Sequence, residues 1–191
     1  MQNEKGIITG HFMSHWGVPK EIRPRKLPGV GDFAILEFAP RGTRTTWRYA
    51  TNGMSGYAQN YPDGLVKVRT ELYGSTKEKA AWVDDLLAAI ATYPLDFTTY
   101  LTEGDTINVG QPIDRRGSRF TGILLARPGL SDPETVGLVA GIPENVLVHQ
   151  VVGILPSEAE FAEQLGGKAL WERLAKNGDL LLDDDSRLPV V

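Results

Sequence analysis

The fold is decided by the stretch VLVHQVVGILPSEAEFAEQLGGKALWERLAKNG, which occupies residues 146–178. Its first ten residues are apolar on both alternating faces, which is typical of a central strand covered on each side. Pro156 ends this strand, and the pattern of Ser157 and Glu160 predicts a capping box that starts a helix. Apolar residues then recur at helical spacing on two segments that Gly166 and Gly167 separate. The stretch therefore predicts a buried strand followed by two short amphipathic helices, with Gly178 as the final cap.

Working outward from this stretch, apolar and β-branched runs predict further strands at residues 33–38, 44–50, 66–73 and 120–127, with a last strand at 180–182. Ser75 and Glu78 form a capping-box pattern before a helix whose apolar residues continue to Ile90, and Pro94 marks its end. Three strands come before this helix, and regular strand–helix alternation is missing. The sequence therefore predicts an α+β fold with a mixed, largely antiparallel β-sheet flanked by helices.

Length and composition predict one domain over residues 1–191, with residues 1–31 as an N-terminal arm or loop and residues 179–191 as an acidic C-terminal tail. The chain has no cysteine, which excludes disulfides, cysteine-ligated metals and thiol catalysis. No signal-peptide pattern and no apolar run long enough to span a bilayer is visible, so we expect a cytoplasmic protein without membrane contact.

The net charge of −4 is unevenly distributed along the chain. Residues 1–155 hold 16 acidic and 16 basic side chains, whereas residues 156–191 hold eight acidic and four basic ones. Residues 20–48 are locally basic, with seven bases and three acids. A pI of 5.4 argues against nucleic-acid binding. The asymmetry is consistent with a charged protein partner or with two ordinary solvated faces.

The three histidines give little support to a metal site. His11 and His15 have the spacing of two ligands on one helical face, but the glycines around them disfavour a helix and no glutamate completes an HExxH motif. His149 lies in the middle of the most apolar strand, where a hydrogen-bonded core histidine is the simpler interpretation. We therefore expect no metal and no cofactor.

Two polar segments are candidates for a partner-binding surface. Asn52 and Ser55 belong to the run Thr-Asn-Gly-Met-Ser-Gly that directly follows a strand, and a tight turn is the structural alternative there. Asp183, Asp184 and Asp185 could contact a basic partner or form a solvated acidic stretch, and they lack the alternating spacing of a calcium loop. No nucleophile elbow, Walker A motif or dinucleotide fingerprint occurs, so the sequence contains no catalytic residue that we can assign.

Three segments together resemble the suppressor of fused family. They are the run from Trp47 to Ser55, the strand that ends in Glu71-Leu72-Tyr73, and residues 148–178 with the tail that reaches Arg187. The resemblance implies a mixed α/β domain with a binding role and no established catalysis. This chain is similar to the single-domain bacterial form, and many bacterial members look like immunity proteins that neutralise a cognate toxin.

The first functional prediction is therefore a non-enzymatic protein-binding domain, an immunity protein of a bacterial polymorphic toxin system. Its partner would be a toxin domain or a peptide segment, and complementary charge would speed their encounter. The alternative is a signalling or scaffold adaptor that binds an endogenous peptide. A third interpretation is an enzyme that uses the loop of residues 51–55, which would need an acid, a base or an ion to converge on that loop.

Overall fold

The structure is a computed structural model, and it describes residues 2–57, 59–60, 67–129, 132, 134–142, 145–177 and 180–191. The α-helices of the described chain are α1 (Gln2–Trp16), α2 (Trp82–Asp96), α3 (Pro156–Leu165) and α4 (Gly167–Leu174). Short 3-10 helices are η1 (Met54–Gly56), η2 (Glu134–Gly137) and η3 (Ala175–Asn177). None of the helices in these residues has the length and apolar character needed to cross a membrane.

One nine-stranded sheet organises the described residues, in the order β1-β2-β3-β5-β9-β7-β6, with β4 beside β5 and β8 beside β9. The strands are β1 (Glu21–Leu27), β2 (Gly31–Phe38), β3 (Trp47–Asn52), β4 (Gln59–Asn60), β5 (Lys67–Thr76), β6 (Thr106–Asn108), β7 (Gly122–Ala126), β8 (Leu138–Val139) and β9 (Val146–Ile154). Only β5 and β9 pair in parallel, and the other pairs of this sheet are antiparallel. The predicted α+β class with a mixed, largely antiparallel sheet is confirmed.

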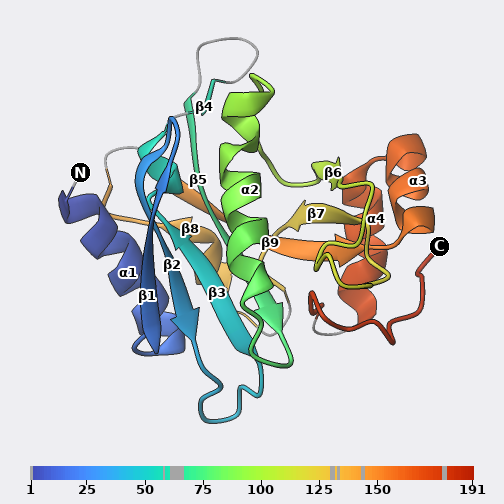
Figure 1. Ribbon diagram of the computed structural model, residues 1–191, viewed down its shortest axis with the longest axis horizontal. Coiled ribbons are helices and arrows are strands. Elements are labelled where there is room, and N and C mark those ends of the chain that lie inside the picture. The colour runs from blue at the N-terminus through green and yellow to red at the C-terminus, as the bar shows by residue number, and fades with distance from the viewer. Residues whose placement is uncertain are drawn as a thin grey trace.

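Helices cover both faces of this sheet (Figure 1). Successive strand residues point to opposite faces, and in β2 Ile35 packs in the cluster that contains α2, whereas Leu36 packs in the cluster that contains α1. At the other end of the sheet, Val152 of β9 packs against α3 and α4. The sheet therefore has α2 on one face, and α1 together with the α3–α4 pair on the other. As predicted, β9 is covered on both sides, and it is buried except for Leu147.

The prediction of an arm or loop over residues 1–31 is wrong. Helix α1 fills residues 2–16 and buries a narrow stripe of Ile8, Phe12 and Trp16 against the sheet. These residues follow one another at i, i+4 and i+8, the spacing of a single helix face. Strand β1 then pairs with β2 along its whole length. Its Pro24 is tolerated because β1 is an edge strand.

Both predicted capping boxes are also wrong in detail. Ser75 lies inside β5, where it pairs with Arg48, and α2 begins later, at Trp82. Helix α3 begins at Pro156, and it is the carboxylate of Glu158 that accepts the amide of Leu155, at 2.9 Å. The cap formed by Leu155 and Glu158 lies two residues earlier than the predicted pair Ser157 and Glu160.

The ends of two other predicted elements also differ from the structure. Pro94 lies inside α2, which continues to Asp96. Residues 180–182 form no strand, although Leu180 and Leu182 are buried. The predicted cap at Gly178 falls outside the described residues.

Candidate functional site

The loop after β3 is built around the carboxylate of Glu71. Glu71 is fully buried, and its Oε1 accepts the amides of Gly53 and Ser55, both at 3.0 Å, and the Ser55 hydroxyl at 2.6 Å. Its Oε2 accepts the hydroxyl of Thr51 at 2.5 Å. A buried carboxylate needs such donors to offset the loss of water. Glu71 thus fixes the loop in one conformation.

The side chains of Asn52 and Ser55 point into the protein. Asn52 donates its Nδ2 to the carbonyl of Lys5 at 3.2 Å and to the hydroxyl of Thr9 at 2.8 Å, which ties β3 to α1. The hydroxyl of Ser55 donates a hydrogen bond to Glu71, and Ser55 is 1% exposed. That these two side chains contact a partner remains a prediction, and the structure gives each of them an internal role.

A cleft opens beside this loop, and we call it the glycine cleft. It has a volume of about 570 Å³ and lies between the first turns of α1, the turn at residues 29–32 and the loop at residues 53–56. The glycines of the lining are Gly29, Gly31, Gly53 and Gly56. Because glycine has no side chain, another backbone can approach closely at the exposed positions Gly29, Gly31 and Gly56.

Gly53 is required by this geometry. Its φ of 116° lies in the left-handed region, and a Cβ at this position would lie 2.6 Å from the carbonyl oxygen of Asp32. The same carbonyl accepts the ammonium of Lys5 at 2.7 Å. The loop, the turn and α1 therefore form one fixed frame around the glycine cleft.

Chemically, the loop is a poor catalytic centre. The enzyme interpretation requires an acid or base that converges on residues 51–55, and Glu71 is the carboxylate that does so. However, Glu71 has four donors and no exposed surface, so it has no free lone pair directed at a substrate. General acid–base catalysis requires the group to reach the substrate proton. The geometry is that of a structural carboxylate.

The aspartates of the tail anchor the C-terminus to the rest of the chain. Asp183 accepts the amides of Lys77, at 2.8 and 2.9 Å, and of Glu78, at 3.1 Å. Asp185 accepts the hydroxyl of Ser118 at 3.0 Å and the amide of Arg119 at 3.1 Å.

Asp184 has a local role within the tail. It accepts the hydroxyl of Ser186 at 2.6 Å, and its backbone carbonyl accepts the amide of Arg187 at 3.0 Å. Partner binding by the three aspartates remains a prediction, and the carboxylates of the other two, Asp183 and Asp185, already have internal bonds to the chain.

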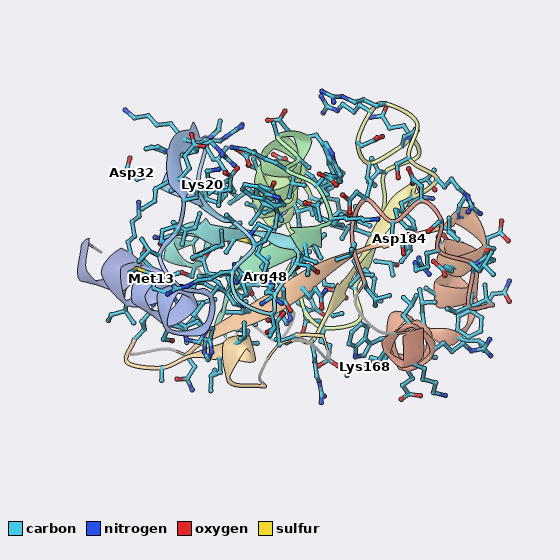
Figure 2. All side chains as sticks on the ribbon, turned by 90° about the horizontal axis from the view of Figure 1, so that it is seen from below. Met13, Lys20, Asp32, Arg48, Lys168 and Asp184 are labelled. Carbon is cyan, nitrogen blue, oxygen red and sulfur yellow. The ribbon has the colours of Figure 1, made fainter. Side chains whose placement is uncertain are left out.

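The two predicted partner-binding segments lie far apart. Asp183 holds the residues that follow β5 at Thr76, and Thr76 pairs with Trp47 at the start of β3, whereas Asn52 is the last residue of β3. Figure 2 shows Asp184 and Asp32 toward opposite ends of the molecule. The structure therefore does not bring the tail and the loop together into one site.

A buried ion pair, which sequence reasoning missed, holds the tail. Both guanidinium nitrogens of Arg187 donate to Glu158, at 2.6 and 2.7 Å, and one of them also donates to the carbonyl of Gly153 at 3.1 Å. Glu158 also accepts the amide of Val190 at 3.2 Å. The tail that reaches Arg187 was visible in the sequence, but no local pattern links Arg187 to Glu158, because 29 residues separate them.

A second buried network joins α1 to the sheet. Asp132 pairs with Arg48 and accepts the indole N–H of Trp16 at 3.1 Å and the hydroxyl of Tyr73 at 2.9 Å. Burial raises the pKa of Tyr73 well above its ordinary value, and the charge of Asp132 raises that pKa further. No sequence signal connects Asp132 to Arg48, because 84 residues separate them.

The histidine predictions have a mixed outcome. His11 and His15 do share a face of α1, with ring centroids 5.0 Å apart, so the expectation that no helix forms there is wrong. His11 donates its Nε2–H to the carbonyl of Val136 at 3.1 Å. His149 is buried as expected, but its Nε2 has no hydrogen-bond partner among the described residues. The described residues contain no group of three potential ligands that could hold a metal ion.

Comparison with known proteins gives one family match. A family model described as "Suppressor of fused protein (SUFU)" matches residues 31–187. No curated protein matches this chain significantly. The matched range contains all three segments on which the sequence resemblance rests.

Solved structures of similar proteins share the fold at low identity. A suppressor of fused homologue from Neisseria gonorrhoeae has a TM-score of 0.77 and 17% identity, and the alignment covers 100% of this chain and 98% of that one. A structure described as the Sufu-Fu complex has a TM-score of 0.74 and 20% identity, over 98% of this chain and 91% of that one. Drosophila Suppressor of Fused has a TM-score of 0.72 and 19% identity, and 96% of this chain matches 50% of that protein.

Proposed function

The chain belongs to the suppressor of fused family, and from this premise we propose that it is a non-enzymatic protein-binding domain that acts as one unit over residues 1–191. We propose further that its partner is the toxin domain of a bacterial polymorphic toxin system, which it neutralises as an immunity protein. The surface we assign to this partner is the glycine cleft.

The glycine cleft carries this proposal. Its walls are fixed before any partner arrives, because Glu71 holds the loop and Lys5 holds the turn. A preformed cleft loses little conformational entropy on binding. Three of its glycines, Gly29, Gly31 and Gly56, are exposed, and an extended segment of the partner can approach the backbone there, as in other modes of peptide recognition. Glu71, the acid next to the cleft, accepts hydrogen bonds from the loop itself and is not free to act on a substrate, which favours binding over catalysis.

Two observations support an immunity role in particular. The fold matches a bacterial homologue over 98% of that protein's length. The net charge of −4, whose excess lies in residues 156–191, attracts basic toxin domains that act on nucleic acids over long range, which raises the association rate without locating the contact surface.

The test is co-expression with the product of the neighbouring toxin gene. We expect the wild-type chain to rescue growth and to co-purify with the toxin domain. Gly56→Trp should fill the glycine cleft, because a Cβ at Gly56 meets nothing within 4 Å and the backbone there needs no positive φ. We expect this variant to fold normally and to bind at least tenfold more weakly, a loss of about 1.4 kcal/mol.

Gly10→Trp is the matched control. Gly10 is exposed on α1, has equally open surroundings and does not line the cleft. We expect this variant to bind the toxin domain like the wild type. Equal binding by Gly56→Trp and Gly10→Trp would show that the partner uses another surface, and failure of the wild type to bind or protect would reject the immunity role.

The adaptor function remains the second candidate, because one similar structure was solved as a complex of Sufu with Fu. It requires the same cleft but a different partner. Affinity capture from the organism that encodes the chain separates the two functions. An adaptor would retain an endogenous protein in the absence of any toxin, and Gly56→Trp would release it.

A further inference from the structure

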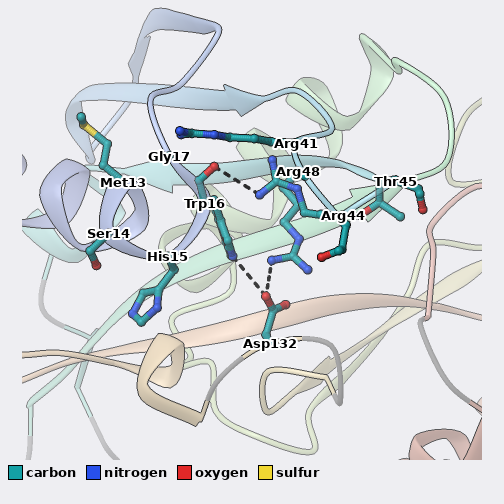
Figure 3. Close-up of a pocket in the computed structure, with 13 residues that line it drawn as sticks. Met13, Ser14, His15, Trp16, Gly17, Arg41, Arg44, Thr45, Arg48 and Asp132 are labelled. Carbon is teal, nitrogen blue, oxygen red and sulfur yellow. Dashed lines mark hydrogen bonds and ion pairs between the residues drawn. The ribbon is translucent and has the colours of Figure 1, made fainter.

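A second cleft lies at the other end of α1, and we call it the arginine pocket (Figure 3). It has a volume of about 630 Å³ and lies between the last turn of α1 and the tight turn at residues 41–46. Its lining includes Arg41, Arg44 and Arg48, and Asp132 is the one carboxylate among its lining residues.

The turn places two arginines directly opposite each other. Arg41 and Arg44 form an isolated antiparallel bridge, with backbone hydrogen bonds of 3.0 and 3.1 Å in both directions. Gly42, with a φ of 61°, provides the left-handed backbone that so short a turn needs. Residues directly opposite in an antiparallel pair share a face, and like charges in that position destabilise the fold.

The carboxylate in the pocket does not neutralise these two arginines. Asp132 already binds Arg48, Trp16 and Tyr73. Arg44 donates instead to neutral backbone carbonyls, those of Ala39 and of Trp16, the latter at 3.4 Å. Neither Arg41 nor Arg44 forms an ion pair within the described part of the chain.

The electrostatics of Arg44 reflect this uncompensated charge. Burial lowers the pKa of Arg44 to about 10, and the positive charges of Arg48 and Arg41 contribute to the same effect, while the charge of Asp132 acts in the opposite direction. Burial and the neighbouring His11 lower the pKa of His15, whereas the charge of Asp132 acts in the opposite direction. Other bases of the segment at residues 20–48 are differently placed, since Arg23 and Arg25 contact Asp84 of α2.

We propose that the arginine pocket binds an anionic side chain of the partner protein, a carboxylate or a phosphate group. Arg41 and Arg44 would be its ligands, and the Arg48–Asp132 pair would hold the floor of the pocket in place. Guanidinium groups bind both anions through paired, charge-assisted hydrogen bonds. The identity of the anion as part of a partner rests on the proposed protein-binding function, whereas anion binding itself does not.

The test is an NMR titration of the full chain, which follows the Nε–H signals of the arginine side chains. The probes are the peptide acetyl-Glu-Glu-Glu-amide, the same peptide with phosphoserine in the centre, and acetyl-Lys-Lys-Lys-amide. We expect the two acidic peptides to shift the signals of Arg41 and Arg44, with an effect that weakens as salt is added, and the lysine peptide to shift neither. The acidic peptide that binds with the higher affinity identifies the preferred anion.

Arg41→Gln is the informative variant, because Arg41 is exposed and makes no side-chain bond among the described contacts. We expect it to weaken binding of the acidic peptides about tenfold, as loss of a charge-assisted hydrogen bond does. It should also unfold at a higher temperature than the wild type without peptide, because a like-charge contact has been removed. Arg116→Gln, at another exposed arginine, should change neither property.

The proposal is overturned if the acidic peptides leave Arg41 and Arg44 unshifted, or if Arg41→Gln and Arg116→Gln weaken binding equally. Tighter binding of a single-stranded oligonucleotide than of either acidic peptide would also overturn it. The peptide result does not depend on the partner. A captured partner that binds Arg41→Gln as tightly as the wild type would reject the pocket and leave the protein-binding function intact. Binding of the acidic peptides without any captured partner would support the pocket and count against the protein-binding function.

Discussion

At the residue scale, the interior depends on buried carboxylates. Glu71 fixes the loop after β3, Asp132 joins α1 to the sheet, and Glu158 receives the tail. Each is satisfied by several donors, as a buried charge must be. The surfaces that we propose for binding lie beside these groups: Glu71 supports the glycine cleft, and Asp132 lies in the floor of the arginine pocket.

The sequence indicated the loop but not the acid beneath it. A polar run with glycine directly after a strand is a local pattern, and the turn that it predicted lies at the end of β3, where η1 begins. Glu71 alternates with Leu72 in a strand that reads as buried on one face and solvated on the other. Both faces are in fact covered, and Glu71 meets its donors only after β3 and β5 have paired. Contacts between distant segments leave no such local pattern.

His149 predicts how stability depends on pH. Burial lowers its pKa to about 4, although the charge of Glu103 acts in the opposite direction. In the unfolded chain the pKa of histidine is about 6.5. As the pH falls from about 6.5 to 4, the unfolded state takes up a proton that the folded state does not. The free energy of unfolding should therefore fall by about 3 kcal/mol over this range, and this group adds no further loss at lower pH.

Urea unfolding at a series of pH values measures this effect. In His149→Gln the titrating group is absent, so the decrease between pH 7 and pH 4 should be smaller by about 3 kcal/mol than in the wild type. Parallel pH curves for the two proteins would show that His149 is protonated equally in both states. That outcome would contradict the depressed pKa.

At the element scale, the elements at the centre of the sheet were predictable and those at its margins were not. Strand β9 and helices α3 and α4 have strong periodicity, and the structure contains them where the pattern placed them. Helix α1 was missed because Gly6 and Gly10 interrupt it and only one residue per turn is buried. Strand β1 was missed because Pro24 and its charges are typical of a loop, although an edge strand tolerates both.

The tail is the element whose attachment makes the sharpest stability prediction. Arg187→Gln leaves Glu158 buried without its cation, and breaking a buried pair in this way costs about 3–5 kcal/mol. We expect that loss in the free energy of unfolding, together with faster amide exchange over residues 183–190. Lys176→Gln is the control, because Lys176 is exposed and lines the same surface cleft as Arg187. It should change the free energy of unfolding by less than about 0.5 kcal/mol.

The double variant Arg187→Gln, Glu158→Gln completes a mutant cycle. It removes both charges, so it should be more stable than Arg187→Gln alone. If Arg187→Gln unfolds with the same free energy as the wild type, and its amides at residues 183–190 exchange no faster, the ion pair does not hold the tail.

At the scale of the whole molecule, the acidic tail lies apart from the two clefts that adjoin α1. The acidic tail is attached through Asp183 and Asp185, whose carboxylates accept the backbone amides of Lys77 and Arg119, and through Arg187, which pairs with Glu158 of α3. Both clefts adjoin α1, the glycine cleft at its first turns and the arginine pocket at its last. The sequence predicted the family and the excess of negative charge, but it could not show that the tail is attached internally. The partner surface that we propose is therefore on the side of α1.

Amide hydrogen exchange on the complex with a captured partner tests this central claim most directly. If the partner occupies the glycine cleft, exchange should slow over residues 29–32 and 53–57 relative to the free chain, and residues 183–191 should be unaffected. Slower exchange confined to residues 183–191, with the cleft unchanged, would contradict the account and assign binding to the acidic tail.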